Sequence, residues 1–306
     1  MEVKRFKVKG NKDIKISCFK IIPENVVGVV HILHGMGEHK ERYLDFANFL
    51  AKNSYAVYVH DHRKHGKSVN SKNEVGIFTK NDKWDDIIDD CNIVNSKIKK
   101  DLPNIKITTL GHSMGSIIAR KFISAYPEAS DSAIIMGTLP VYGLKKALVP
   151  LLITSVMNLF NPKNNRSPFM AKQLNMPLIK EFEPRRTDFD WITSDEKIVD
   201  KYVKDPLCGY TYSTRFYNEF FKGILNVNKL NVLLSTKNIP LLFISGVLDP
   251  VGEHGEGVKS IKELYESNGF TNLTLEIVKD ARHEVLNEKN KDYTYKFIMD
   301  WLKKVK

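Results

Sequence analysis

The residues best suited to chemistry in this sequence are a serine, an aspartate and a histidine on three separate segments. Ser113 is the central residue of a G-x-S-x-G pattern that runs from Gly111 to Gly115. A serine hydroxyl attacks a carbonyl carbon only when a base takes its proton, and a carboxylate commonly orients that base. Asp249 and His283 follow Ser113 in the order acid, then base. We predict that the three residues act as nucleophile, acid and base.

The same chemistry needs two backbone N–H groups that stabilise a negatively charged oxygen. One donor is expected at Met114, the residue after the nucleophile. The other is expected in the stretch HGMGEH, where Gly35 and Gly37 allow the chain to turn sharply. We therefore predict that the N–H groups of Met36 and Met114 form this oxyanion site.

Other residues near the acid and the base compete for these roles. His254 is the only other histidine after Ser113, but the base is expected one strand after the acid, which favours His283. Asp280 and Glu284 are alternative carboxylates, although charges beside a catalytic histidine are usually solvated loop residues.

Histidines near two early strands raise the question of a metal site. They are His31, His34, His39, His60, His62 and His65. None has the H-E-x-x-H spacing or the paired cysteines of common zinc sites. The predicted serine chemistry also needs no ion. We predict no metal and no cofactor.

The elements that must position these residues alternate in type along the first part of the chain. Apolar runs typical of buried strands occupy residues 26–33, 55–61, 105–110 and 131–137. Helical patterns occupy residues 40–52, 81–100 and 114–127, and Asn81 or Asp82 is expected to cap the second. A hairpin is expected around the N-terminal KGNKD. This alternation predicts an α/β fold with a mostly parallel, doubly wound sheet.

The alternation stops in the middle of the chain and then resumes. Residues 139–236 are rich in proline and aromatic residues and contain no buried β-run, whereas two further strand–helix units follow. We predict one discontinuous core domain, residues 1–138 and 237–306, with a helical insertion over residues 139–236.

Composition excludes several classes of protein. The net charge is +11, but the lysines are scattered and no aromatic residues alternate with them, so nucleic acid is not expected as a partner. Three cysteines are too few for a disulfide framework and the N-terminus has no apolar signal region. The longest apolar run, residues 147–160, contains Pro150 and is too short to span a bilayer. We expect a soluble, cytoplasmic protein without stable membrane insertion, although transient contact with lipid surfaces stays open.

Several stretches together resemble the α/β-hydrolase superfamily, and within it the monoacylglycerol lipase and lysophospholipase group, which is similar in turn to the serine aminopeptidases. They are HGMGEHKERY, VYVHDHRKHGKS, GHSMGS, DPLCGYTYSTRFY, SGVLDPVGEHGEGV and ARHEVLNE. The resemblance implies the α/β-hydrolase fold with a helical cap over the site. It also implies the roles given above to Ser113, Asp249, His283, Met36 and Met114, and a small ester or single-chain lipid as substrate.

The resemblance leaves the substrate open. The apolar residues 147–160 and the aromatic residues of 212–221 suggest an acyl-chain pocket, or they pack the cap helices together. An aminopeptidase-like enzyme would need an acidic group for the substrate amine, for which Glu181, Glu183 and Asp188 are candidates. A non-catalytic ligand-binding homologue is the third alternative. One departure from the family is Lys64, where glycine is usual, and we expect it to alter a local turn.

Overall fold

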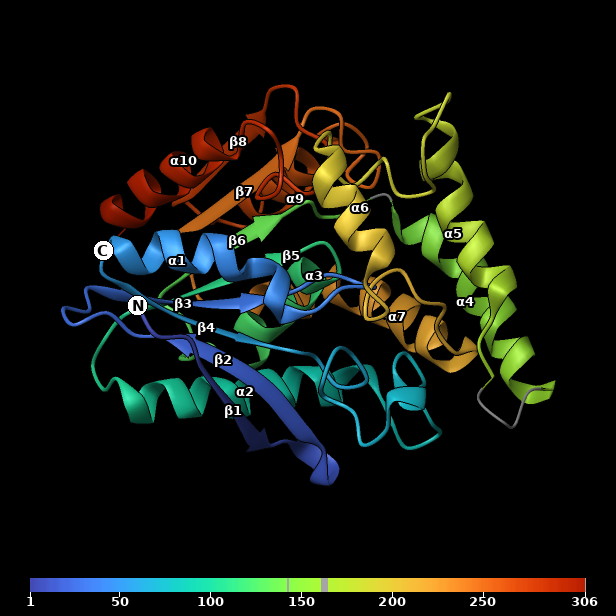
Figure 1. Ribbon diagram of the computed structural model, residues 1–306, viewed down its shortest axis with the longest axis horizontal. Helices are drawn as coiled ribbons and strands as arrows, with labels where there is room; N and C mark the ends of the chain where they lie inside the picture. The colour runs from blue at the N-terminus through green and yellow to red at the C-terminus, as the bar shows by residue number, and fades with distance from the viewer. Residues whose placement is uncertain (142, 161–164, 306) are drawn as a thin grey trace.

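The computed structural model describes residues 1–141, 143–160 and 165–305. Residues 142 and 161–164, which belong to the predicted insertion, lie outside the described residues. Figure 1 shows a central twisted sheet with helices on both faces and a group of helices beyond one end of the strands.

The sheet has eight strands in the order β1-β2-β4-β3-β5-β6-β7-β8. Their bounds are β1 Lys4–Lys9, β2 Lys15–Ile21, β3 Gly28–Leu33, β4 Tyr55–His60, β5 Ile107–His112, β6 Ser132–Met136, β7 Leu241–Gly246 and β8 Leu273–Val278. The hairpin β1–β2 and the pair β2–β4 are antiparallel, whereas all the other pairs are parallel. The prediction of an N-terminal hairpin and a mostly parallel sheet is confirmed.

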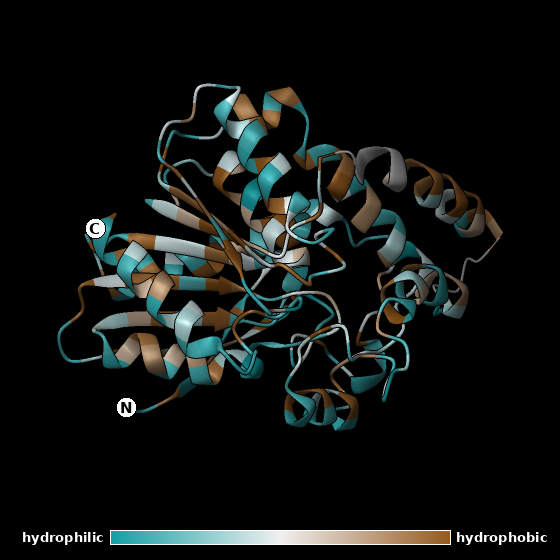
Figure 2. Ribbon diagram, turned by 90° about the horizontal axis from the view of Figure 1, so that it is seen from above, coloured by the Kyte–Doolittle hydropathy of each residue, from teal (hydrophilic) through white to brown (hydrophobic). Residues whose placement is uncertain are grey.

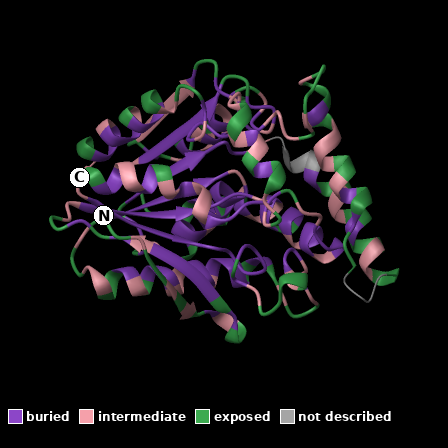
Figure 3. Cartoon of the chain, in the orientation of Figure 1, coloured by how far each residue is buried: buried purple, intermediate pink, exposed green. Residues whose placement is uncertain are grey.

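Helices cover both faces of this sheet. On one face lie α1 (Leu44–Lys52) and α10 (Lys291–Lys304), and on the other lie α2 (Trp84–Asp101), α3 (Met114–Ala125) and α9 (Glu256–Glu266). Every residue of strands β3 to β7 is consequently buried, as Figure 3 shows. Strands buried on both faces need continuous apolar runs, which is why these runs were visible in the sequence.

The chain between β6 and β7 is helical in its described part. Its helices are α4 (Gly143–Phe160), α5 (Pro168–Lys180), α6 (Glu196–Lys204), α7 (Thr214–Val227) and α8 (Leu230–Leu234). Helix α7 packs against α4, α2 and α3, so this helical group is anchored to the core. Helix α4 continues through Pro150 without ending there. None of the described helices combines the length and the apolar character that crossing a membrane requires.

The predicted cap of α2 is wrong by one or two residues. The helix begins at Trp84, after Lys83, because the carboxylate of Asp86 accepts the N–H of Lys83 at 2.8 Å. Asp82 instead accepts the N–H and the hydroxyl of Thr79, in the turn before the helix. Three acidic residues in six positions made this boundary ambiguous in the sequence.

Lys64 occupies a turn with the left-handed backbone that glycine adopts freely. Its φ is 62°, at a cost of about 1–2 kcal/mol for a residue with a Cβ. The N–H of Lys64 donates to Ser68 and its carbonyl accepts from Gly76. The ammonium group pairs with Glu74 at 2.7 Å. The lysine thus adopts a backbone conformation that glycine adopts at lower cost, and whether it alters the turn stays a prediction.

Candidate active site

Ser113 lies at the junction between β5 and α3, where the chain turns sharply. Its φ of 54° and ψ of −119° are far from both strand and helix values. The N–H of Ser113 donates to the carbonyl of Met136 at the end of β6, 2.9 Å away, which fixes the turn against the sheet. A non-glycine residue keeps such a strained conformation only when its surroundings impose it, and this is common at functional sites.

The two glycines of the motif are required by close backbone contacts. A Cβ on Gly111 would lie 2.1 Å from the carbonyl oxygen of Gly115, and a Cβ on Gly115 would lie 2.1 Å from that of Leu33. Any side chain at either position would therefore push α3 away from the sheet. The G-x-S-x-G spacing follows from how closely this helix approaches β3 and β5.

Asp249 and His283 meet above the sheet on the loops that follow β7 and β8. The two atoms Nδ1 of His283 and Oδ1 of Asp249 are 2.8 Å apart, and both side chains are buried. Ser245 donates its hydroxyl to Asp249 Oδ2 at 2.9 Å, and the N–H of Val251 donates to Oδ1 at 3.0 Å. Burial favours the neutral acid, but the charge and hydrogen bond of His283 outweigh it and lower the pKa of Asp249.

The competing residues lie elsewhere. His254 is half-exposed and contacts Glu181 with its Nε2 at 2.5 Å. Asp280 is exposed. The interpretation of Glu284 as a solvated loop charge is wrong, because Glu284 is buried and contacts Arg42 through both carboxylate oxygens at 2.6 Å.

The loop after β3 contains Met36 and is held by its own histidine. Nδ1 of His34 donates to the carbonyl of Gly35 at 2.8 Å, while Nε2 accepts the N–H of His62 at 3.0 Å. Because a trans peptide points its C=O and N–H in opposite directions, fixing the Gly35 carbonyl also fixes the N–H of Met36. Among the described residues, no hydrogen bond uses that N–H group.

A cavity of about 350 Å³ brings the predicted residues together. Ser113, His283, Met36 and Met114 all line it. Asp249 is not exposed to the cavity and lies behind His283. The Trp191 ring, from the chain between α5 and α6, lies 5.4 Å from the His283 ring, centroid to centroid.

Much of the remaining lining is apolar and comes from the chain between β6 and β7. Helix α5 contributes Leu174 and Leu178, and α7 contributes Phe220, Phe221 and Ile224. From residues 147–160 only Ala147 lines the cavity, so of the two alternatives left open for that segment, the acyl-chain role has little support. Sequence reasoning missed α5, because an even spread of apolar residues in a helix does not show which face meets a cavity.

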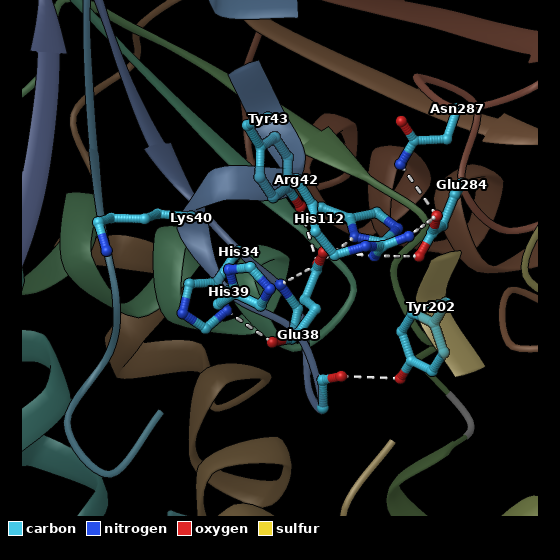
Figure 4. Close-up of polar contacts among 12 residues, drawn as sticks. His34, Glu38, His39, Lys40, Arg42, Tyr43, His112, Tyr202, Glu284 and Asn287 are labelled. Carbon is cyan, nitrogen blue, oxygen red and sulfur yellow. Dashed lines mark hydrogen bonds and ion pairs between the residues drawn. The ribbon is translucent and has the colours of Figure 1, made fainter. Parts of the chain in front are cut away.

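Buried charges lie beside the cavity, and Figure 4 shows the polar contacts among them. Glu38 accepts from the N–H of Gly35 at 2.6 Å, from Tyr43 at 2.9 Å and from Arg42 at 2.7 Å. Burial disfavours the ionised form of Glu38, but Arg42 and His112 outweigh it and keep its pKa well below the ordinary value. The loop that contains Met36 is thus attached to a charged network whose hydrogen bonds are satisfied.

His112 connects this network to the predicted base. Its Nδ1 is 3.2 Å from Glu38 Oε1, and its ring centroid lies 4.7 Å from that of His283. Burial disfavours the charged imidazolium, but the hydrogen bond and charge of Glu38 outweigh it and raise the pKa of His112.

The clustered histidines have hydrogen-bonding roles within the core. His60, His62 and Cys91 offer ligand atoms within 4.8 Å of one another. The ring of His60 is already partnered, however, with His31 at 3.2 Å and Cys91 at 3.7 Å. In the other close group, His39 pairs with Asp205 at 2.8 Å. The expectation that no metal is needed stays a prediction.

Comparisons with known proteins agree with this geometry. The family described as "Serine aminopeptidase, S33" matches residues 24–290, most of the chain. The chain belongs to this family. It is 26% identical to the monoglyceride lipase of Mus musculus over 263 residues, covering 85% of this chain and 76% of that protein. It is 21% identical to the monoacylglycerol lipase of Mycolicibacterium smegmatis, covering 90% and 88%.

Solved structures of similar proteins establish the α/β-hydrolase fold of this S33 family member. A thermostable carboxyl esterase from Bacillus coagulans, in complex with glycerol, superposes with a TM-score of 0.91 at 22% identity, over 100% of this chain and 99% of that one. A soluble variant of the Saccharomyces cerevisiae monoglyceride lipase superposes with a TM-score of 0.76 at 19% identity, over 99% and 95%. The sequence prediction of a serine hydrolase with this fold is confirmed.

The ion pair between His112 and Glu38 predicts that the stability contributed by His112 depends on pH. A histidine with a raised pKa in the folded state contributes stability that is complete below pH 6.5 and is lost as the pH rises through the folded pKa. We expect His112→Asn to lower the free energy of unfolding by about 2 kcal/mol at pH 6, and by less as the pH rises. Urea unfolding of both proteins between pH 5 and 9 measures the difference. A difference that stays constant over this range would show that folding does not raise the pKa of His112.

Proposed function

We propose that Ser113, His283 and Asp249 form the catalytic triad of an ester hydrolase that cleaves single-chain lipids, monoacylglycerols or lysophospholipids. The observation that carries the proposal is the buried 2.8 Å contact between His283 and Asp249, beside a cavity that the strained Ser113 also lines. This arrangement has a nucleophile, a base and a group that orients the base.

The proposed reaction is acyl transfer through a covalent intermediate. His283 takes the proton of Ser113 through Nε2, because the contact with Asp249 holds the other nitrogen, and the serine oxygen attacks the ester carbonyl. His283 then protonates the leaving alcohol and activates the water that hydrolyses the acyl-enzyme. Asp249 stays ionised, consistent with its lowered pKa, and stabilises the imidazolium.

The developing oxyanion is proposed to bind the N–H groups of Met36 and Met114. Met114 is the first residue of α3, so its N–H lies at the positive end of the helix dipole. Met36 lies on the loop after β3, and the peptide that carries its N–H is fixed by His34. Such preorganised donors stabilise the transition state without having to reorient during the reaction.

A lipid substrate is supported by the apolar walls of the cavity. Leucines of α5 and aromatic residues of α7 would bury an acyl chain, which gains about 0.8 kcal/mol per buried CH₂. A lipid substrate also agrees with the names of the relatives, which are monoglyceride and monoacylglycerol lipases.

The aminopeptidase-like alternative has weaker support. Glu181 contacts His254, while Glu183 and Asp188 pair with Arg185, and none of the three lines the cavity. Glu38, Glu253 and Glu284 do line the cavity, but Arg42 pairs with both Glu38 and Glu284. A substrate ammonium group would have to compete with that guanidinium. A non-catalytic ligand-binding protein would have no need for the strained backbone at Ser113, which is typical of a functional residue.

We further propose that the helices of residues 139–236 form a cap that contacts lipid surfaces through α4. This helix exposes an apolar side to solvent, and its hydropathy can be followed in Figure 2. The residues at least half exposed there are Val149, Leu152, Val156, Leu159 and Phe160. Apolar patches of this kind mark interaction sites, and the net charge of +11 favours an anionic lipid surface over a protein of like charge.

A cytoplasmic location is part of the proposal. It is supported by Cys18, Cys91 and Cys208, which are all free and buried thiols. Free thiols persist in reducing compartments.

The triad is tested by Ser113→Ala. We expect kcat for monoacylglycerol and aryl ester hydrolysis to fall by about 10⁴-fold or more, because no other group can form the acyl-enzyme, while the thermal unfolding midpoint stays close to that of the unmodified protein. Initial rates across aryl esters, monoacylglycerols, lysophospholipids and aminoacyl amides measure both activity and preference. Ser124→Ala, near the other end of α3 and away from the cavity, is the matched control, because its hydroxyl donates to the carbonyl of Val232. Near-normal turnover by Ser113→Ala would refute the triad, and faster cleavage of amides than of esters would refute the lipid substrate.

The lipid contact is tested by the double substitution Leu152→Ser and Leu159→Ser. Both side chains are more than 60% exposed, so the fold should not change. We expect hydrolysis of monoacylglycerol in anionic vesicles to fall by about tenfold, because less apolar surface enters the interface, and hydrolysis of a soluble short ester to stay the same. Leu234→Ser, at an exposed leucine of α8, serves as the control. Equal rates on vesicles before and after the double substitution would contradict the proposal.

A further inference from the structure

The loop that contains Met36 is held from the side of the predicted cap as well as from the core. The N–H of Gly37 donates to the hydroxyl of Tyr212 at 2.5 Å. The carbonyl of Gly37 accepts from the hydroxyl of Tyr202 at 2.8 Å, a contact drawn in Figure 4, and from the N–H of Gly209 at 2.9 Å. Residues 202–212 therefore hydrogen-bond both the N–H and the carbonyl of Gly37.

The direction of the hydrogen bonds at Tyr212 follows from its neighbour His65. Nδ1 of His65 lies 2.9 Å from the carbonyl of Arg63, which can only accept, so the ring proton is on Nδ1. Burial lowers the pKa of His65 to about 4, so its Nε2 keeps a lone pair at neutral pH. Tyr212 donates to that Nε2 at 3.0 Å. The hydroxyl oxygen of Tyr212 is then oriented to accept from Gly37.

Tyr212 itself has little freedom to move. Its ring stacks on the ring of Phe216 in α7, with centroids 3.9 Å apart and planes 20° apart, and the side chain is 2% exposed. The hydroxyl contact with Tyr210 is longer, at 3.3 Å, beyond the usual range of an O–H···O bond. A rigid ring thus holds one oxygen between His65 and Gly37.

We propose that Tyr212 is a positioning residue for the oxyanion site, and this inference rests on the function proposed above. Met36 lies between two peptide groups. His34 fixes the one before it through the Gly35 carbonyl, and Tyr212 fixes the one after it through the Gly37 N–H. With both groups fixed, the N–H of Met36 cannot turn away from the cavity. From the sequence, the aromatic residues of 212–221 were expected either to line an acyl-chain pocket or to pack the cap helices together.

The proposal is tested by Tyr212→Phe, which keeps the stacked ring and removes only the hydroxyl. We expect kcat for a soluble aryl ester to fall about tenfold, with KM changed less than twofold, because the donor is misplaced in the transition state rather than in substrate binding. A boronic acid that forms a tetrahedral adduct with Ser113 should bind about tenfold more weakly, since its oxygen occupies the oxyanion site. Tyr202→Phe should cost less, about threefold in kcat, because Gly209 still donates to the same carbonyl.

Tyr295→Phe is the matched control, because it removes a buried tyrosine hydroxyl that donates to a backbone carbonyl at 3.2 Å, away from the cavity. It should lower the thermal midpoint about as much as Tyr212→Phe and leave kcat and the boronic acid affinity unchanged. Values of kcat and inhibitor affinity within twofold of the unmodified protein for Tyr212→Phe would overturn the positioning role. If Tyr212→Phe does not fold, the same readouts on His65→Asn decide the matter, because that change removes the Nε2 acceptor that orients the Tyr212 hydroxyl. Activity that persists in Ser113→Ala would instead overturn the triad, so the two failures are distinguishable.

Discussion

The turn at Ser113 is the constraint on which the rest of the site depends. Its left-handed backbone brings the start of α3 to the end of β5, and the contacts at Gly111 and Gly115 leave no room for a Cβ. Because the helix begins immediately after the serine, the hydroxyl lies at the end of the sheet where the loops after β3, β7 and β8 also converge. The strain at this one residue is maintained by the packing of α3 on a sheet that is buried on both faces.

Hydrogen bonds from buried side chains hold the loops around Ser113 in place. His34 and Tyr212 fix the peptides on either side of Met36, while Asp249 fixes the orientation of His283. Each of these polar groups is buried, and a buried polar group is stable only when it has a partner. The site is therefore rigid before any substrate enters, as electrostatic stabilisation of a transition state requires.

Much of this arrangement could be predicted from the sequence because its causes are local or ordered along the chain. The G-x-S-x-G spacing, the apolar strands and the order of Asp249 and His283 are visible without any tertiary contact. The paired roles of Arg42 and Glu284 could not be predicted, since these residues are 242 positions apart and only the fold brings them together. The cavity lining could not be assigned for a similar reason: α4 is apolar on the side that faces solvent, whereas the less conspicuous α5 faces the cavity. The hydrogen bond between Tyr212 and Gly37 could not be predicted either, because the two residues are 175 positions apart.

The central claim is that Ser113 is a nucleophile activated by His283. The most direct measurement is the reaction of the purified protein with a fluorophosphonate, followed by intact mass and peptide mapping of the adduct. We predict one phosphonyl group per chain, located on Ser113, and no adduct when His283 is replaced by alanine. A protein that remains unmodified, or one labelled equally in the His283→Ala variant, would contradict the account.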